Sequence, residues 1–260
     1  NIKQSLHTLI SSYKYKEAIS LYHSYKRTFE DGVPNDVLPL LEHAQLRLGL
    51  DYDGALQKSR KVGAVSLSSS FTDKKLRKLY DFLMLMEVRL KQDQIEDFVL
   101  KTTPFMYELM RYYFTKEFDV NWRQVEKKTS KGVRLDMVAF KNQYPKLYES
   151  WRKNSDTPYL QELQVSFYHM LYMLEDYDTV DRSLLNQLKE IRRIEQKIRN
   201  KMAHEVVVFT EQDICKAAEI QSLQSFLHQI KGVFFIITGQ AKQNKLIYDV
   251  INQYVLEQIQ

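Results

Sequence analysis

Residues 182–204 read RSLLNQLKEIRRIEQKIRNKMAH and predict the longest helix of the chain, from Arg182 to Ala203. At about 100° per residue, five apolar side chains fall in one narrow sector and predict the buried stripe of this helix: Leu184, Leu188, Ile191, Ile198 and Met202. The opposite sector collects polar side chains: Lys189, Arg193, Lys197, Asn200 and His204. The helix is therefore expected to pack by one face and to present cations on the other.

The end of this helix gathers three residues with chemical potential. Asn200 and His204 lie one turn apart on the basic face, and Arg199 is expected to reach around from a partly buried position beside the stripe. Residues 205–209 break the helical pattern, and Thr210 with Asp213 resembles a capping box for the next helix. His204 therefore belongs at a helix C-terminus, where the helix dipole favours the protonated imidazole.

The rest of the chain predicts an all-α protein. With seven glycines and five prolines in 260 residues, the sequence favours helices joined by short connections. Residues 1–91 are expected to form a helical-hairpin linker domain, with the linker-like Ser66 to Ser70 and an N-cap at Thr72-Asp73 before a long helix. Its helices are predicted at 2–12, 16–29, 36–48, 54–62 and 72–90.

Residues 92–260 are expected to form the second domain. Pro104 suits the first turn of a helix that runs from about Phe105 to Lys116, and residues 118–136 look irregular, with an exposed turn at 130–132. Further helices are predicted at 137–144, 146–153, 158–174, 211–230 and 243–258. The apolar runs 206–209 and 233–238 fit an extended conformation, although two short runs do not establish a sheet.

The charge of the chain is concentrated in one segment. The formal net charge is +5, and residues 182–204 alone hold seven cations against two acids. The single cysteine, Cys215, forms no intrachain disulfide and fits a reducing cytoplasm. We also expect no membrane span and no signal peptide. Because the chain starts at Asn1 without an initiator Met, it is interpreted as a fragment of a longer protein.

The segment Arg199-Asn200-Lys201-Met202-Ala203-His204 matches the signature of the HEPN (higher eukaryotes and prokaryotes nucleotide-binding) ribonucleases, in which Arg and a polar residue precede His. The stretches 15–18 and 97–104 and the later helices resemble one HEPN family, the ancillary ribonucleases of type III-A CRISPR systems, sixth in the Csm series. That family carries an N-terminal CARF (CRISPR-associated Rossmann fold) domain, which senses cyclic oligoadenylate. No alternation of strands and helices with a Gly-rich loop occurs here, so the sensor is expected to be missing.

The resemblance implies an endoribonuclease of antiviral defence that cleaves single-stranded RNA without metal or cofactor, at a composite site in a homodimer. Its catalytic residues here would be Arg199, Asn200 and His204. Histidine suits proton transfer near neutral pH, and arginine suits phosphate oxygens. Arg193, Lys197 and Lys201 would bind the RNA backbone. Cyclic oligoadenylate would control the full-length protein through the sensor domain.

Two other interpretations remain open at this point. In the first, His204 is an ordinary helix-end histidine and Arg199 a surface cation. In the second, the chain is a non-catalytic helical dimerisation or interaction module. A metal enzyme is disfavoured because no His-x-His, Glu-x-x-His or Cys-x-x-Cys pair occurs. The sequence also leaves open which of Arg199 and His204 acts as base or acid, and which bases the enzyme prefers.

Overall fold

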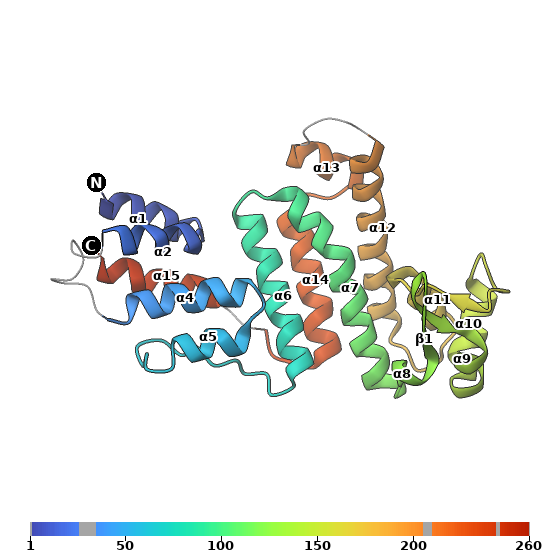
Figure 1. Cartoon of the computed structure of the whole chain (residues 1–260). Coiled ribbons are helices and arrows are strands. Elements are labelled where there is room, and N and C mark those ends of the chain that lie inside the picture. The colour runs from blue at the N-terminus through green and yellow to red at the C-terminus, as the bar shows by residue number, and fades with distance from the viewer. Residues whose placement is uncertain (1, 26–34, 205–209, 243–244, 260) are drawn as a thin grey trace. The chain divides into compact units, whose positions relative to one another are not determined.

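The computed structural model describes residues 2–25, 35–204, 210–242 and 245–259, and the side chain of His204 lies outside this description. Fourteen helices and three short strands occur in the described residues, which confirms the expected all-α class (Figure 1). The chain forms two compact units. The first contains Asn1–Gln94 and Ala241–Gln260, and the second contains Ile95–Gln240. The last helix therefore belongs to the same unit as the first ninety-four residues. The sequence had suggested a single boundary between two domains, near residue 92.

The first unit is a set of helical hairpins closed by the C-terminal helix. Its helices are α1 (Ile2–Ser11), α2 (Tyr15–Ser24), α4 (Val37–Leu48), α5 (Tyr52–Lys58), α6 (Lys74–Lys91) and α15 (Ile247–Gln258). Neighbours in sequence pack together as α1 with α2, α2 with α4, and α4 with α5, while α15 contacts both α1 and α4. The predicted cap of α6 is present, because the Asp73 side chain accepts hydrogen bonds from the backbone of Lys75 and Leu76.

Polar contacts inside the first unit hold α15 against the N-terminal hairpin. The Tyr15 hydroxyl donates to Asn252 Oδ1 at 2.8 Å, and Asn252 Nδ2 donates to the carbonyl of Ile10 at 3.0 Å. Tyr15 and Asn252 are both buried, so these hydrogen bonds satisfy groups that water does not reach. The C-terminal helix is therefore an integral part of this unit.

Three helices, α7 (Ile95–Phe118), α12 (Arg182–His204) and α14 (Leu223–Thr238), contact one another pairwise and form the centre of the second unit (Figure 1). Around them lie α8 (Trp122–Val125), α9 (Met137–Gln143), α10 (Pro145–Asn154), α11 (Phe167–Leu174) and α13 (Glu211–Ala218). Aromatic side chains fill the space between α7 and α14: Phe98 packs edge-on against Phe226, and Phe105 tilts against Phe234. All four rings are buried, and each contributes about 2–3 kcal/mol of apolar burial.

Two helix predictions in the second unit were wrong, and one run that was expected to be extended is helical. Pro104 lies inside α7 instead of starting it, because buried side chains from Phe98 onward pack that face of the helix well enough to offset the lost backbone hydrogen bond. The predicted 211–230 helix is split, since Glu219 adopts φ 58° and Ser222 caps a new helix. The 233–238 run is helical within α14, whereas the 206–209 run lies outside the described residues.

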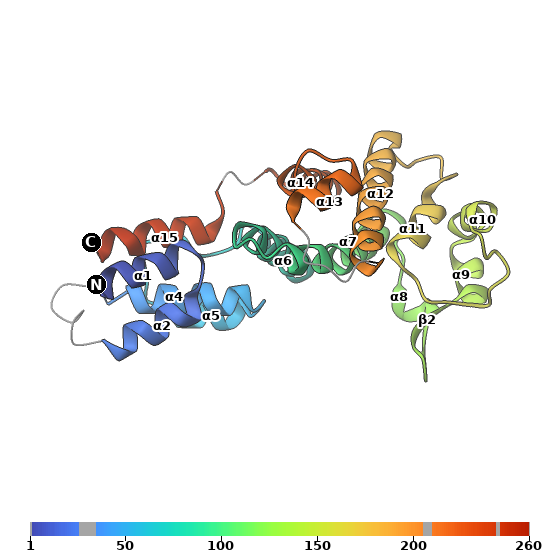
Figure 2. The same ribbon diagram turned by 90° about the horizontal axis from the view of Figure 1, so that it is seen from above.

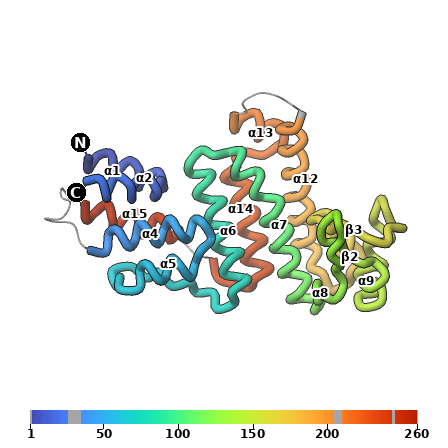
Figure 3. The backbone as a smooth tube through the Cα atoms, in the orientation of Figure 1, coloured from blue at the N-terminus to red at the C-terminus, as the bar shows by residue number. Residues whose placement is uncertain are grey.

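The region expected to be irregular forms a small antiparallel sheet. The sheet has the strand order β1 (Glu126–Thr129), β2 (Gly132–Asp136) and β3 (Glu162–Leu163) (Figure 3). Strand β3 lies within the range predicted as a helix at 158–174, of which only α11 is helical. The exposed turn expected at 130–132 is the hairpin turn, where Gly132 has φ 99°. Thr129 Oγ1 donates to the Gly132 carbonyl at 2.9 Å and tightens that turn.

We predict that His43 makes the protein less stable in mild acid. Burial lowers the pKa of His43 from 6.5 to about 4, while its Nδ1 contacts the carbonyl of Ala55 at 2.9 Å. The unfolded chain therefore binds a proton between pH 6.5 and 4 that the folded chain does not, so this stability is complete above pH 6.5 and falls as the pH drops towards 4. Urea unfolding at a series of pH values measures the slope.

The matched variants are His43→Gln and His7→Gln. His7 is exposed, so its replacement should leave the slope unchanged. His169, whose pKa burial also lowers to about 4, should contribute to the slope that remains in His43→Gln. An unchanged slope in His43→Gln would contradict the prediction.

Candidate functional site

The buried face of α12 largely follows the predicted stripe. Leu184, Leu188, Ile191 and Ile198 are at most 5% exposed, as expected. Met202 is only half-buried because the helix approaches its end there. Leu185 and Ile194 are also buried, which widens the apolar face towards the neighbouring helices. This packing fixes the rotation of α12 and therefore the directions in which its polar side chains point.

The three motif residues occupy the last two turns of α12. His204 is the last residue of the helix, and Asn200, one turn earlier, is exposed. Arg199 has a side chain that is 55% exposed, which makes it more open than the partly buried position expected from the flank of the stripe. Its Nη1 lies 3.7 Å from Glu195 Oε1, so the guanidinium is drawn back along the helix by one turn.

Glu195 is a buried carboxylate at the base of the motif. Its side chain is 1% exposed, and it accepts hydrogen bonds from Arg192 Nη1 at 2.8 Å and from the Thr103 hydroxyl of α7. Two arginines of its own helix and one hydroxyl of a neighbouring helix therefore surround a charge that would otherwise be costly to bury. Glu195 was not among the site residues predicted from the sequence, although the helical wheel places it in the middle of the apolar stripe.

The same network extends to α11. The Arg192 guanidinium lies 5.4 Å above the Tyr168 ring, and together with burial it lowers the pKa of the neighbouring His169 to about 4. His169 is held as part of a capping box with Ser166 at the start of α11. Arg192 thus serves to bind Glu195 and to pack α11 on α12, and it is only 24% exposed.

The cations predicted to bind RNA are engaged with acidic neighbours. Arg193 contacts Glu190 at 2.6 Å and Glu219 at 3.2 Å, and Lys197 contacts Glu219 at 2.7 Å. Glu219 ends α13, so these ion pairs attach α13 to α12, and the two helices lie beside each other in Figure 2. Hydrogen bonds from Thr210 lower the pKa of Asp213 on α13, and the charge of Lys201 adds to that lowering. Phosphates would have to compete with these carboxylates.

The helix that follows the motif starts at the predicted cap. Thr210 and Asp213 form the expected capping box, in which the Asp213 backbone N–H donates to Thr210 Oγ1 at 3.2 Å and the Thr210 backbone N–H donates to Asp213 Oδ2 at 3.1 Å. α13 therefore begins where the sequence predicted it.

Within the described residues, no three His, Cys, Asp or Glu side chains are grouped so that they can hold a metal ion. A search of the same residues for a helix that is long and apolar enough to cross a bilayer finds none.

An all-α unit with an Arg-Asn motif and a His at the end of its central helix defines the chain as a HEPN-type protein. Within that class it belongs to the family of the HEPN domain of Csm6, a CRISPR-associated family of ribonucleases, because the family model for the Cas Csm6 HEPN domain matches residues 68–256. The match takes in α6 and α15 of the first unit as well as the whole second unit.

A solved structure agrees with this assignment. The fold is similar to that of Enterococcus italicus Csm6 bound to cyclic hexa-2'-fluoro-hexa-dAMP, with a TM-score of 0.70 and 14% sequence identity. The similarity covers 98% of this chain and 56% of that protein, so the chain spans little more than half its length. At this identity the similarity establishes the fold. No curated protein sequence matches the chain.

We predict that Glu195→Gln destabilises the second unit. The amide keeps a hydrogen-bond acceptor for Thr103 but no longer neutralises Arg192, so the free energy of unfolding should fall by about 1–3 kcal/mol. Urea denaturation followed by circular dichroism measures the change. The control is Glu190→Gln, which removes an exposed carboxylate from the same helix and should cost less than about 1 kcal/mol. If both variants lose the same free energy of unfolding, the burial of Glu195 adds nothing to its contribution to stability.

Proposed function

We propose that the chain is a metal-independent endoribonuclease that cleaves single-stranded RNA and acts as a homodimer in type III CRISPR antiviral defence. The observation that carries the proposal is the motif of Arg199, Asn200 and His204 on the final turns of α12, in a chain of the Csm6 HEPN family. Both Arg199 and Asn200 are exposed, so a substrate can reach them.

The chemistry follows from the groups that the motif supplies. A base removes the proton of the RNA 2′-hydroxyl, and its oxygen attacks the adjacent phosphorus. The 5′-oxygen then leaves with a proton, so the products are a 2′,3′-cyclic phosphate and a 5′-hydroxyl. Histidine at a helix C-terminus suits one proton transfer, and the fixed charge of Arg199 suits the phosphorane oxygens. Asn200 would orient these groups by hydrogen bonding.

RNA would lie along the face of α12 that carries Arg193, Lys197 and Lys201, with phosphates replacing Glu219 as the partner of the first two. One Arg and one His per chain form a sparse site. Two copies related by a twofold axis would double both groups, and we therefore propose that the α12 helices of two chains face each other.

The structural neighbour bears on control, because that protein is bound to a cyclic hexanucleotide analogue. We propose that cyclic oligoadenylate activates the full-length protein through a sensor domain outside these 260 residues. The active protein would then degrade RNA in the cytoplasm as part of antiviral defence.

The first prediction concerns metal. Because proton transfer and charge stabilisation are both assigned to side chains, cleavage of a fluorogenic single-stranded RNA should be unchanged in EDTA and should leave a 2′,3′-cyclic phosphate. Product analysis by mass spectrometry identifies that terminus. Loss of cleavage in EDTA, with recovery on adding Mg²⁺ or Mn²⁺, would rule out this mechanism.

The second prediction concerns the motif. Arg199→Ala and His204→Ala should each lower kcat by roughly a thousandfold, whereas Asn200→Ala should lower it about tenfold. His228→Ala, an exposed histidine on α14, is the matched control and should keep full activity. If His204→Ala cleaves RNA normally, the alternative of a non-catalytic interaction module with a contaminating nuclease becomes the better explanation.

The third prediction concerns assembly. Activity per chain should fall when the protein is diluted below its dimerisation constant, and sedimentation should show dimers at higher concentration. Mixing inactive Arg199→Ala with inactive His204→Ala produces heterodimers in which one chain keeps His204 and the other keeps Arg199, so recovered activity reports how far the two chains share one site. Cleavage at full rate by a strict monomer would refute the composite site.

A further inference from the structure

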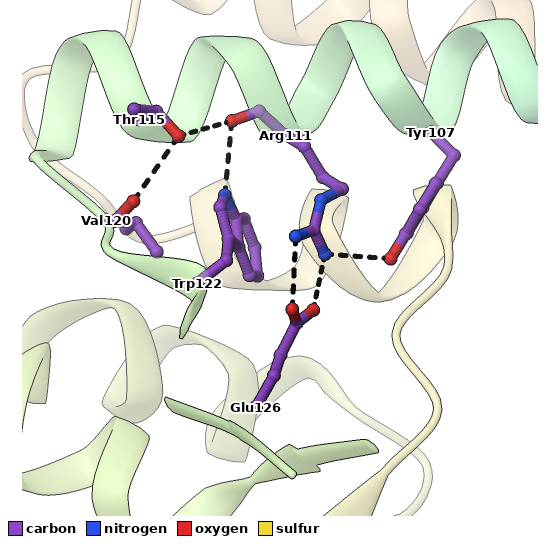
Figure 4. Close-up of polar contacts among 6 residues, drawn as sticks. All are labelled: Tyr107, Arg111, Thr115, Val120, Trp122 and Glu126. Carbon is purple, nitrogen blue, oxygen red and sulfur yellow. Dashed lines mark hydrogen bonds and ion pairs between the residues drawn. The ribbon is translucent and has the colours of Figure 1, made fainter. Parts of the chain in front are cut away.

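The hairpin of β1 and β2 is anchored to α7 by a polar cluster at its base. Glu126, the first residue of β1, pairs with Arg111 of α7, whose Nη2 donates to Glu126 Oε2 at 3.1 Å (Figure 4). The same guanidinium donates to the Tyr107 hydroxyl at 3.0 Å and lies 4.4 Å from the Trp122 ring. The indole Nε1 of Trp122 donates to the Arg111 carbonyl at 3.3 Å. The base of the hairpin is therefore held firmly to the central bundle.

Beyond this anchor the hairpin is basic. Residues 126–136 contain Lys127, Lys128, Lys131 and Arg134, and both acids of the segment already have partners. Glu126 binds Arg111, while Asp136 caps α9 through the backbone of Val138 and Ala139 and pairs with Lys127. With respect to the residues that the structure describes, Lys128, Lys131 and Arg134 form no side-chain hydrogen bond or ion pair. Three cations thus remain available to a ligand.

The register places these cations on both faces and at the tip. Lys127 lies directly opposite Arg134, and Lys128 lies opposite Val133, so successive side chains point to alternate faces. Lys131 lies in the turn. Like charges that face each other across two strands destabilise a hairpin, and the ion pair of Lys127 with Asp136 offsets part of that cost. A polyanion laid against the hairpin would reverse the cost.

An exposed aromatic ring lies on the next strand connection. The backbone N–H of Met137, directly after β2, donates to the carbonyl of Gln161 at 2.9 Å, which brings the segment before β3 to the edge of the hairpin. In that segment the side chain of Tyr159 is 93% exposed, whereas many other aromatic side chains of the second unit are buried. An exposed aromatic ring and free cations are the two features that single-stranded nucleic acids require, for base stacking and for phosphate contacts.

We propose that the β1–β2 hairpin, with Tyr159 beside it, is an accessory binding surface for single-stranded RNA, distinct from the α12 motif. The inference rests on the proposed ribonuclease function. It assigns substrate binding to a surface with unpaired cations, whereas Arg193 and Lys197 of α12 are paired with Glu190 and Glu219. Phosphates bind Lys128, Lys131 and Arg134, and a base stacks on Tyr159. The hairpin holds the substrate and takes no part in the bond cleavage.

Fluorescence anisotropy with a long, unstructured single-stranded RNA tests the surface, on a His204→Ala background so that the probe stays intact. The triple change Lys128→Gln, Lys131→Gln, Arg134→Gln removes three phosphate contacts. The slope of log affinity against log salt should become shallower by about 2, since each contact on a single strand contributes about 0.7. Between about 50 and 200 mM salt, the parent should therefore lose roughly twentyfold more affinity than the variant.

Two controls separate a local site from net charge and from stacking. The changes Lys16→Gln, Lys61→Gln and Lys75→Gln remove three exposed cations from the first unit and should leave the slope unchanged. Tyr159→Ala should weaken binding about tenfold without altering the slope, because stacking releases no counterions. Equal slopes in the two triple variants, or an unchanged affinity in the hairpin triple variant, would overturn the proposal.

Cleavage assays with His204 restored distinguish the two proposals. The hairpin triple variant should raise KM for long RNA and leave kcat within about twofold of the parent, because its residues do not contact the reacting atoms. Salt-dependent binding through the hairpin without any cleavage would sink the ribonuclease and leave the RNA surface standing. If the hairpin triple variant cleaves long RNA with the KM of the parent, the ribonuclease proposal stands and the hairpin is not an RNA-binding surface.

Discussion

The second unit depends on the burial of one carboxylate. Glu195 lies in the middle of the apolar face of α12 and is almost inaccessible to water, so its charge requires partners inside the protein. Arg192 and Thr103 provide the closest of them, and Arg199 approaches from the exposed side. This requirement fixes the position of α12 along the axis of α7, because a shift by one turn would separate Glu195 from Thr103. It also links the packing of the core to the orientation of the arginine on which the proposed chemistry depends.

Two groups of surface cations in the second unit, on α12 and on the β1–β2 hairpin, have different physical roles. Those of α12 are neutralised by carboxylates on α12 and at the end of α13, and they contribute to helix packing at partly exposed positions, where each ion pair adds little stability. Of those in the hairpin, Lys127 pairs with Asp136, whereas Lys128, Lys131 and Arg134 have no acidic partner among the described residues. A high density of positive charge in a sequence is therefore a poor guide to where a polyanion binds. The decisive property is whether the cations have already been paired.

The sequence predicted those features that depend on local periodicity and missed those that depend on tertiary partners. The α12 helix, its apolar stripe and the caps at Asp73 and Thr210 follow from residue spacing alone. The β1–β2 hairpin was missed because its first strand is polar on both faces, and the only fully buried side chain in the pair is Leu135. The break at Glu219 was missed because the apolar pattern continues across it. Glu195 was visible as an acid within an apolar stripe, but only the position of Thr103, which is 92 residues away in sequence, shows what neutralises it.

The return of the chain from the second unit to the first constrains how this protein can be divided. Residues 95–240 are inserted between two parts of the first unit, and α15 supplies Tyr248 and Asn252 to a core that also contains Tyr15. Removal of α15 would expose the apolar side of α1 and α4 and leave the Tyr15 hydroxyl without its acceptor, a loss on the order of several kcal/mol. The family match, which extends from residue 68 to residue 256, likewise includes both α6 and α15. A single boundary near residue 92 therefore separates α15 from the helices with which it packs. The second unit is better described as an insertion within the sequence of the first.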